Sequence, residues 1–478
     1  MEQVVPDLCR DGEECVSFSV DEPEMASLVT LMALVRSHPH LVSASPHRTV
    51  EALRGMLDEA MSAQINLVLH HPEWQQLEAS WRGLRYLVLA VKDAPDIRVR
   101  LLDIGKRELS RTLRKFRGMN WDQSPIFKRV YEEEYGQLGG TPFGLLVGDY
   151  EFDHHGEDVQ CLASMAQVAA AAHAPFLSNA SPALLRMERW SELGNPRDVT
   201  RILGTPDYAA WHALRGQEDA RYVGLCLPRF LMRLPYGART DPDDRFAFEE
   251  ESDGPDSAGF LWANAAWAFA GNVARAFAAY GWCARIRGVD SGGLVEDLPV
   301  LAFSTADGDS DHRCVTEIAM SDQRESELAQ AGLIPLVYRK NTRAAAFVSA
   351  QSLQRPVEHD DPDATLNAAL SARLPYLLAS CRFAHYLKCM VRDKTGTSWS
   401  AVQLQSWLGE WLIGYVDGAP ETSDETWKAE HPLADGHVVV EEQEGAPGHY
   451  QAKFFLRPHY QLEGLSAALR LVSTLPRR

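Results

Sequence analysis

The sequence predicts a mixed α/β protein in which helices and short strands alternate along most of the chain. Some segments have apolar residues in steps of three and four, the period of a helix, whereas shorter segments have continuous or alternating apolar residues, as strands do. Beyond about residue 363 the order changes, because two long helices come first and segments of period two follow them. This last part is therefore expected to be a separate α+β region.

The N-terminal region is expected to be mainly helical. An acidic stretch with Pro23 opens a short helix that ends near residue 36. Ser45 and Pro46 then provide a cap and a first-turn proline for a longer helix, which the proline at residue 72 ends. A further helix carries tryptophan, leucine and valine residues in steps of four and three as far as Val91.

Two elements of different character follow. Residues 97–104 alternate apolar and polar side chains, which predicts a strand. The next helix, residues 106–117, gathers basic residues in a chain that is acidic as a whole. These residues are Lys106, Arg107, Arg111, Arg114, Lys115 and Arg117. Such a helix face is either solvated or a docking patch for an acidic neighbour.

Residues 127–152, FKRVYEEEYGQLGGTPFGLLVGDYEF, form the most distinctive segment of the chain. The segment combines an acidic helix end, a turn at residues 139–140, and an apolar strand at 142–147 that the glycine and aspartate at 148–149 are expected to end. A phosphate loop would need a Lys-Ser/Thr pair after its glycines, and this segment has none. A dinucleotide fingerprint would have its glycines after the strand, whereas here the glycines at 139–140 precede it. Every part of the segment therefore has a structural explanation.

The middle of the chain is expected to continue the alternation of helices and strands around a polar loop at residues 240–259. The expected helices are 158–174, 261–280 and 322–330, and the expected strands are 298–303, 315–320, 333–338 and 344–349. The helix at 261–280 is the most apolar of these. It contains Asn264, Asn272 and Arg275, which a membrane span tolerates badly, so we expect a buried helix.

The C-terminal part is expected to begin after an acidic boundary at residues 357–363. The expected helices are 364–392, interrupted by Pro375, and 399–416. The expected strands 437–444 and 449–457 form a hairpin around the turn GAPG, and a third extended segment, 465–473, follows them. Because side chains alternate along a strand, each strand has an apolar pair on one face. The pairs are Val438 with Val440, Phe454 with Leu456, and Leu469 with Leu471.

Charge and cysteine content limit the partners and the compartment. The chain of 478 residues has 47 Lys and Arg against 66 Asp and Glu, a net charge of −19, which disfavours binding to nucleic acid or to an anionic membrane. The eight cysteines form no C-x-x-C pair and are expected to be reduced, buried thiols. The N-terminus lacks the pattern of a signal peptide, so we expect a cytoplasmic protein without membrane insertion.

No set of residues predicts catalysis, a cofactor or a metal. The nearest cluster to a metal site is Asp149, Glu151, Asp153, His154, His155, Glu157 and Asp158. Neighbours on one turn rarely converge on an ion, and a solvated loop that caps the next helix explains the same residues. The aspartates at 307–311 resemble a calcium loop, but His312 and Ile318 stand where Gly and Glu are required. His385 and Cys389 share a helix face, where a packed thiol is commoner than a nucleophile.

Residues 127–152 and several other blocks resemble the large subunit of the contractile sheath of type VI secretion systems, a relative of phage tail-sheath proteins. The other blocks are ASWRGL at 79–84, AAAAHAPF at 169–176, EDARYVGLCLPRFLMRLPYG at 218–237, LWANAAWAF at 261–269, YGWCARIRGVDSGGLVEDLP at 280–299, LSARLPYLLASCRFAHYLK at 370–388 and FFLRPHYQLEGL at 454–465. The resemblance extends from about residue 45 to the C-terminus. It implies a tail-sheath-like fold with an N-terminal arm (1–60), a main sheath domain (61–362) and a C-terminal sheath domain (363–478).

The resemblance also implies partners. The large subunit pairs with a small sheath subunit, and the pairs polymerise helically around an inner tube of hexameric rings. The sheath assembles on a baseplate and contracts, which drives the tube and its spike into a target cell. An AAA+ unfoldase dismantles contracted sheaths of this kind, but only residues 23–36 correspond to the longer N-terminal helical region that it recognises, which makes this partner doubtful.

The terminal strands are the expected subunit-contact site. Unpaired N–H and C=O groups at strand edges must be covered or shared, and strands added between subunits would use them. A head-to-tail contact that does not close produces a helix. The expected contact residues are Val438, Val440, Phe454, Leu456, Leu469 and Leu471. Two alternatives stay open: a sheath subunit of another phage-tail-like contractile injection system, and a cytoplasmic enzyme.

Overall fold

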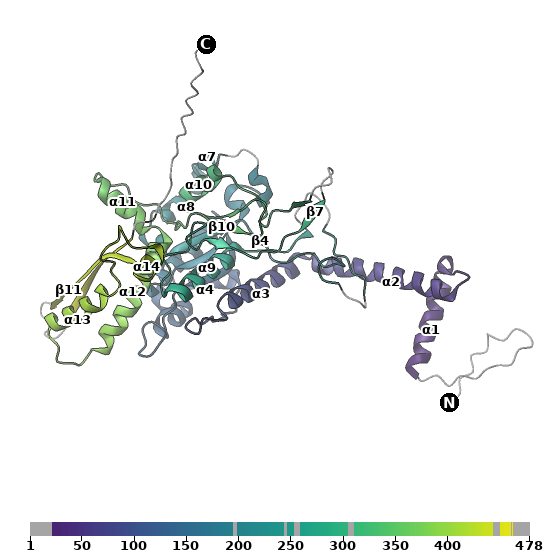
Figure 1. The fold of residues 1–478 in the computed structure, drawn as a ribbon, viewed down its shortest axis with the longest axis horizontal. Coiled ribbons are helices and arrows are strands. Elements are labelled where there is room, and N and C mark those ends of the chain that lie inside the picture. The colour runs from purple at the N-terminus through teal and green to yellow at the C-terminus, as the bar shows by residue number, and fades with distance from the viewer. Residues whose placement is uncertain are drawn as a thin grey trace, which may run out of the picture. The chain divides into compact units, whose positions relative to one another are not determined.

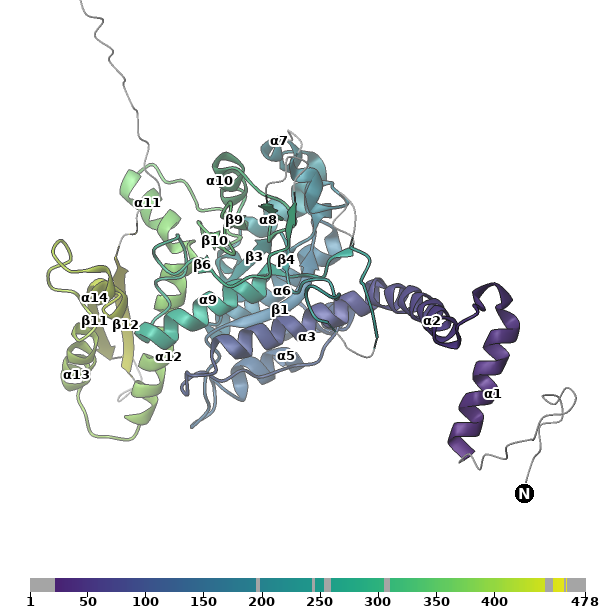
Figure 2. The same ribbon diagram turned by 45° about the vertical axis from the view of Figure 1, so that its right-hand side comes forward.

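The computed structural model describes residues 22–194, 198–242, 246–252, 259–304, 310–442, 450–459 and 461. The chain divides into two compact units, residues 1–71 with 235–259, and residues 72–234 with 260–478. Helices and strands occur together, as Figures 1 and 2 show, so the predicted mixed class is confirmed.

The first unit contains two helices, α1 (Glu22–Ser37) and α2 (Pro46–Leu69), in the places that the sequence predicts. Asn66, near the end of α2, is buried and holds the 235–252 segment against the helix. Its side chain donates a hydrogen bond to the Glu249 carbonyl oxygen (3.3 Å) and accepts one from the Glu251 N–H (3.1 Å). Both hydrogen-bonding ends of this buried amide are therefore satisfied.

A six-stranded sheet forms the centre of the second unit. Its strands, in spatial order, are β1 (Leu146–Phe152), β2 (Phe176–Ala180), β3 (Val223–Leu227), β9 (Ile334–Tyr338), β10 (Ala345–Phe347) and β6 (Leu294–Val295). The first four strands are parallel, whereas β10 is antiparallel to both of its neighbours. Every residue of β2 and β3 is buried, as expected for parallel strands covered on both faces.

Helices cover this sheet (Figure 2). The apolar helix α9 (Ala265–Tyr280) and the helix α6 (Gly156–Ala172) both pack against β1, β2 and β3. Outside them, α3 (Pro72–Ala90) packs on α9, and α4 (Lys106–Lys115) packs on α6. Gly83 of α3 allows the closest approach, because a Cβ there would lie 2.4 Å from the Trp267 ring. The helix predicted at 261–280 is thus a buried helix that begins at Ala265.

The C-terminal part of this unit has its own apolar cluster. After α11 (Pro362–Ser371), α12 (Leu374–Asp393) begins with Pro375 in its first turn, where a proline N–H is not needed. The helix α13 (Ala401–Ile413) packs against a hairpin of β11 (Leu433–Glu442) and β12 (Tyr450–Pro458).

The remaining α-helices and strands of the described residues are short. They are α5 (Pro125–Phe127), α7 (Val199–Leu203), α8 (Ala209–Arg215), α10 (Asp322–Gln330), α14 (Glu425–Glu430), β4 (Phe230–Leu231), β5 (Trp262–Ala263), β7 (Ala302–Ser304) and β8 (Ser310–His312).

Several strand predictions are wrong. Residues 97–104 form no strand, because no other segment that the structure describes pairs with their backbone. Residues 315–320 make only a single bridge, from Thr316 to Phe230, and the segment predicted at 298–303 is a strand only from residue 302. The strand predicted at 142–147 begins at Leu146 and runs through Gly148, which does not end it. A Cβ at Gly148 would lie 2.6 Å from the Phe176 ring, so glycine serves close packing there.

Candidate functional site

The distinctive segment 127–152 ends in β1, and its polar groups tie β1 to neighbouring elements. The Asp149 carboxylate accepts hydrogen bonds from the Ser80 hydroxyl of α3 and from Asn264 Nδ2, the latter at 2.7 Å. Tyr150 Oη donates to the Ile104 carbonyl oxygen at 2.7 Å, and burial raises the pKa of this phenol to about 12. These groups are used within the fold, which supports the structural interpretation of the segment.

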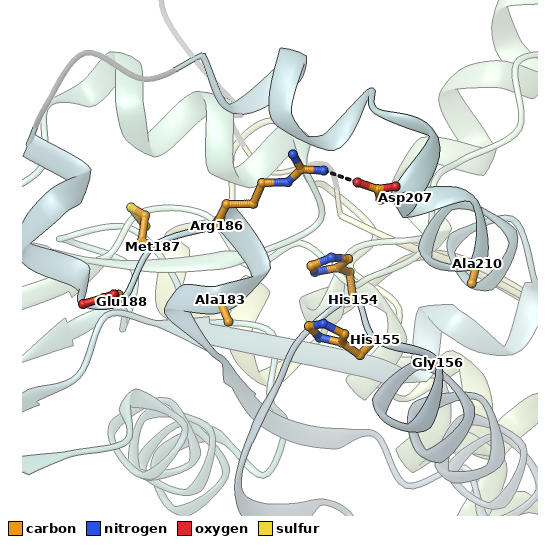
Figure 3. A pocket seen from close by; sticks show the side chains of 9 residues that line it. All are labelled: His154, His155, Gly156, Ala183, Arg186, Met187, Glu188, Asp207 and Ala210. Atoms are coloured by element: carbon orange, nitrogen blue, oxygen red, sulfur yellow. Dashed lines mark hydrogen bonds and ion pairs between the residues drawn. The ribbon is translucent and has the colours of Figure 1, made fainter.

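A pocket of about 660 Å³ lies beside the turn between β1 and α6 (Figure 3). Its lining residues are His154, His155, Gly156, Ala183, Arg186, Met187, Glu188, Asp207 and Ala210. Figure 3 shows the two imidazoles near one another, with the Arg186–Asp207 ion pair beyond them. His154 stacks on Tyr208, with ring centroids 4.2 Å apart, and burial lowers the pKa of His154. Burial therefore favours the neutral imidazole of His154.

At the edge of the pocket, three neighbouring residues of the predicted acidic and histidine cluster come together in the part of the chain that the structure describes. Asp153, His154 and His155 each offer one ligand atom within 4.8 Å of the others. Two ligands of a tetrahedral zinc ion would lie roughly 3.4 Å apart. His155 Nδ1 instead pairs with Asp153 at 2.7 Å, and its ring faces that of His154 at 4.6 Å and 33°. The arrangement is that of a hydrogen-bonded, stacked turn.

The other acidic residues of this cluster are engaged elsewhere, two of them with the basic helix α4. Lys106 Nζ donates to Asp158 (2.8 Å), Arg114 pairs with Glu157 (2.6 Å), and Arg117 donates to Gln160. Asp158 also accepts from the Asp153 N–H at 2.9 Å. One side of α4 thus contacts the acidic start of α6, while Arg107, Arg111 and Lys115 are exposed.

His385 and Cys389 do not form a nucleophilic pair. His385 is 2% exposed and bonds through Nε2 to the Ala172 carbonyl oxygen at 2.9 Å. Burial is the main cause that lowers the pKa of His385 to about 4, and the nearby cations Arg382 and Lys388 act in the same direction. Cys389 Sγ instead accepts from Arg392. His385 therefore joins α12 to the end of α6 as a neutral structural residue.

The expected subunit-contact residues fall into two groups. Val438 (6% exposed) and Val440 (8% exposed) are buried, and Phe454 and Leu456 are partly buried, in the cluster formed with α13. Their side chains thus contact the helix of their own chain. Leu469 and Leu471 lie outside the described residues, as does the expected segment 465–473. The hairpin itself forms where the sequence predicts it, with Val438 opposite Phe454.

The hairpin edges can be assigned from one hydrogen bond that the sequence did not signal. The Val440 N–H points away from β12 and donates to Gln405 Oε1 of α13 at 2.9 Å. In an antiparallel ladder, opposite residues alternate between pairs whose N–H and C=O groups point inward and pairs whose groups point outward. Ala452, opposite Val440, therefore directs its N–H and C=O groups to the outer edge of β12. Phe454 and Leu456 do the same, because they follow Ala452 at intervals of two residues along the strand.

Within the described part of the chain, no helix has both the length and the apolar character that a membrane crossing requires. The apolar helix α9 is covered by the sheet and by α3.

Family comparisons match most of the chain. The EvpB/VC_A0108 tail sheath N-terminal domain matches residues 52–354, and the EvpB/VC_A0108 tail sheath gpW/gp25-like domain matches residues 363–475. The chain belongs to this tail sheath family. The resemblance that the sequence blocks indicate is therefore confirmed.

Individual relatives of this tail sheath protein differ in how much they share with it. The type VI secretion system sheath protein TssC1 of Pseudomonas aeruginosa is 58% identical over 436 residues, which are 91% of this chain and 88% of the relative. The baseplate structure of the anti-feeding prophage is similar over 80% of this chain and 84% of that chain, with 10% identity and a TM-score of 0.41. The contracted helical sheath of that prophage covers 65% of this chain and 66% of that one, with 12% identity and a TM-score of 0.28. The sequence relation carries the family assignment.

Proposed function

We propose that this tail sheath protein is the large subunit of a type VI contractile sheath. It pairs with a small sheath subunit, the pairs polymerise helically around an inner tube, and contraction of the polymer propels tube and spike. The observation that carries the proposal is the match of both tail sheath domains together with the identity to TssC1. A baseplate on which the sheath grows is part of the same proposal.

The proposed role is structural and cytoplasmic. Among the described residues, burial is the main cause of the shifted pKa values of His154 and His385 and of the thiols Cys161, Cys226 and Cys381. We assign the arm to residues 1–60, the main sheath domain to 61–362 and the interlocking domain to 363–478. The C-terminal apolar cluster and the second family match, which begins at residue 363, support the last boundary. The compact units instead group residues 61–71 and 235–259 with the arm.

The subunit contact at the hairpin is proposed to run through backbone groups. The side chains of Val438 and Val440 are occupied by α13, and Gln405 covers part of the β11 edge. The outward N–H and C=O groups of Ala452, Phe454 and Leu456 leave β12 as the edge that a strand from a neighbouring subunit can extend. The segment around Leu469 and Leu471, for which the sequence predicts an extended conformation, is a candidate for that added strand.

A backbone substitution tests this contact. Ala452→Pro removes an outward N–H but no hydrogen bond within the hairpin, so the folded chain should melt near the wild-type temperature while sheath formation is lost. Ala452→Ser keeps the N–H and serves as the matched control. Both variants are co-expressed with the small sheath subunit and imaged by electron microscopy. Wild-type sheaths in the Pro variant would refute strand addition at β12, and absence of sheaths for the unaltered pair would refute the proposed function.

A further inference from the structure

A row of three cationic residues runs along the outer side of α4. Arg107, Arg111 and Lys115 are spaced i, i+4 and i+8, so they lie one above another on the same helix face. All three are exposed, and within the described residues none forms an ion pair. By contrast, Lys106 and Arg114 are paired with the acidic start of α6.

This cationic row works against the stability of its own helix. Like charges at i and i+4 repel each other, and Arg107 in the first turn opposes the positive end of the helix dipole. Lys115 Nζ lies 5.9 Å from the centroid of the Phe116 ring, a distance at which a cation–π contact is weak. The chain has a net charge of −19, yet none of the ion pairs formed among its described residues balances this surface. An external acidic partner would supply the missing charge.

The chain also carries an acidic surface without cationic partners. Residues 358–363, which lead into α11, include four exposed carboxylates: Glu358, Asp360, Asp361 and Asp363. The loop is held in shape by Thr365, whose hydroxyl bonds to the backbone of His359 in both directions at 2.8 and 2.9 Å. Asp361 caps α11 by accepting from the Asp363 N–H, whereas Glu358 and Asp360 have no ion pair among the described residues.

We propose that the cationic row on α4 of one copy binds the acidic loop 358–363 of a second copy. Both surfaces lie in the same compact unit, yet no hydrogen bond or ion pair joins them within one chain (Figure 1 labels α4 and α11). Two different complementary surfaces on one subunit give a head-to-tail contact, which can repeat without closing. The inference rests on the proposed function, since it assigns a contact between successive subunits of the polymer.

Exposed ion pairs suit such a contact. Each is weak and screened by salt, so the pairs can separate and reform as subunits move, while many copies along a polymer add up. The contact steers subunits into register more than it holds them. In this proposal the stability of the polymer comes mainly from the packed core of each subunit and from the backbone contacts proposed at β12.

Charge reversal with compensation tests the proposal. The basic reversal is Arg107→Glu with Arg111→Glu, and the acidic reversal is Glu358→Arg with Asp360→Arg. Each pair, co-expressed with the small sheath subunit, should lower the yield of sheath polymer about tenfold, the size expected when two exposed ion pairs become two like-charge pairs. The combination of all four substitutions should restore the yield to within about twofold of wild type, because the pairs re-form with opposite polarity.

The matched control is Arg339→Glu with Arg343→Glu, which changes the net charge equally at exposed residues elsewhere in the same unit. This control should behave as wild type, and thermal melting of every variant should show a folded chain. Unchanged polymer in the basic reversal would overturn the proposal. Loss without restoration in the combined variant would also overturn it, since the acidic partner would then be another chain. Normal wild-type sheaths in those cases would leave the proposed function intact.

Discussion

The parallel strands of the central sheet and the C-terminal hairpin are built from similar numbers of residues but are stabilised differently. Every residue of β2 and β3 is buried, because α6 and α9 cover them and further strands lie on either side. Among the described residues the hairpin has two strands, one face of which packs on α13 while the side chains of the other face are mostly exposed. The first region therefore depends on packing from all directions, and the second keeps backbone edges that a neighbour can use.

The largest expected effect compares one aromatic residue of the covered central sheet, to which β10 belongs, with one of the hairpin. Phe347 of β10 is fully buried and contacts Phe269 edge-on at 5.0 Å, so Phe347→Ala should lower the free energy of unfolding by about 3–5 kcal/mol. Phe455 of β12 is 50% exposed and stacks on His437 at 4.5 Å. Phe455→Ala should cost less than about 1.5 kcal/mol. Urea unfolding measures both, and equal losses would contradict the distinction between the regions.

The second effect concerns the junction between the regions, where His385 of α12 bonds to Ala172 of α6. The pKa of His385 in the folded chain, about 4, lies below the usual value of 6.5. Between these two pH values the imidazole is protonated in the unfolded chain but neutral in the folded chain. The contribution of His385 is therefore complete above pH 6.5 and is lost as the pH falls toward 4. At about 1.4 kcal/mol per pKa unit, the loss approaches about 3 kcal/mol.

His385→Gln, which keeps a hydrogen-bond donor, should remove this part of the pH dependence. The free energy of unfolding is measured for both proteins from pH 7.5 to pH 4.5, and the difference between them isolates His385 from the titrating carboxylates. Parallel curves for variant and wild type would show that the junction does not depend on a neutral imidazole.

A smaller effect separates the two faces of the hairpin. Val438→Ala removes two buried methyl groups from the cluster with α13 and should cost roughly 1–2 kcal/mol. Val439, the next residue, points to the other face, and Val439→Ala should cost about 0.5 kcal/mol or less. Thermal melting distinguishes the two variants. A larger loss for Val439 would mean that the opposite face of the hairpin carries the packing.

The smallest effect lies on the exposed face, where Lys453 Nζ pairs with Glu441 at 2.6 Å. Both side chains are about half exposed, so water screens the pair, and Lys453→Ala should change the free energy of unfolding by less than about 1 kcal/mol. High salt should reduce even this difference. A loss that persists in 1 M NaCl would indicate that the lysine stem, not its charge, stabilises the hairpin.

The candidate contact site was predicted only in part. Alternation along the strand places Val438 and Val440 on one face, and the structure confirms that they share it. Which element covers this face could not be read from the strands, because α13 approaches from another part of the chain. Gln405 has no distinguishing signal in the sequence, although its bond to the Val440 N–H identifies which backbone groups point outward.

The sequence by itself predicted most of the longer helices and where several of them begin, but not the short helices α7, α8 and α14. Pro46, Pro72 and Pro375 each stand in the first turn of an observed helix, because a helix satisfies its hydrogen bonds within about four residues and its signals are local. The tertiary structure decided which of the strand candidates form strands. Residues 97–104 have the alternation of a strand but no partner, whereas β2 and β3 lack alternation and form the centre of the sheet. A strand exists only where a distant segment supplies the other half of its hydrogen bonds.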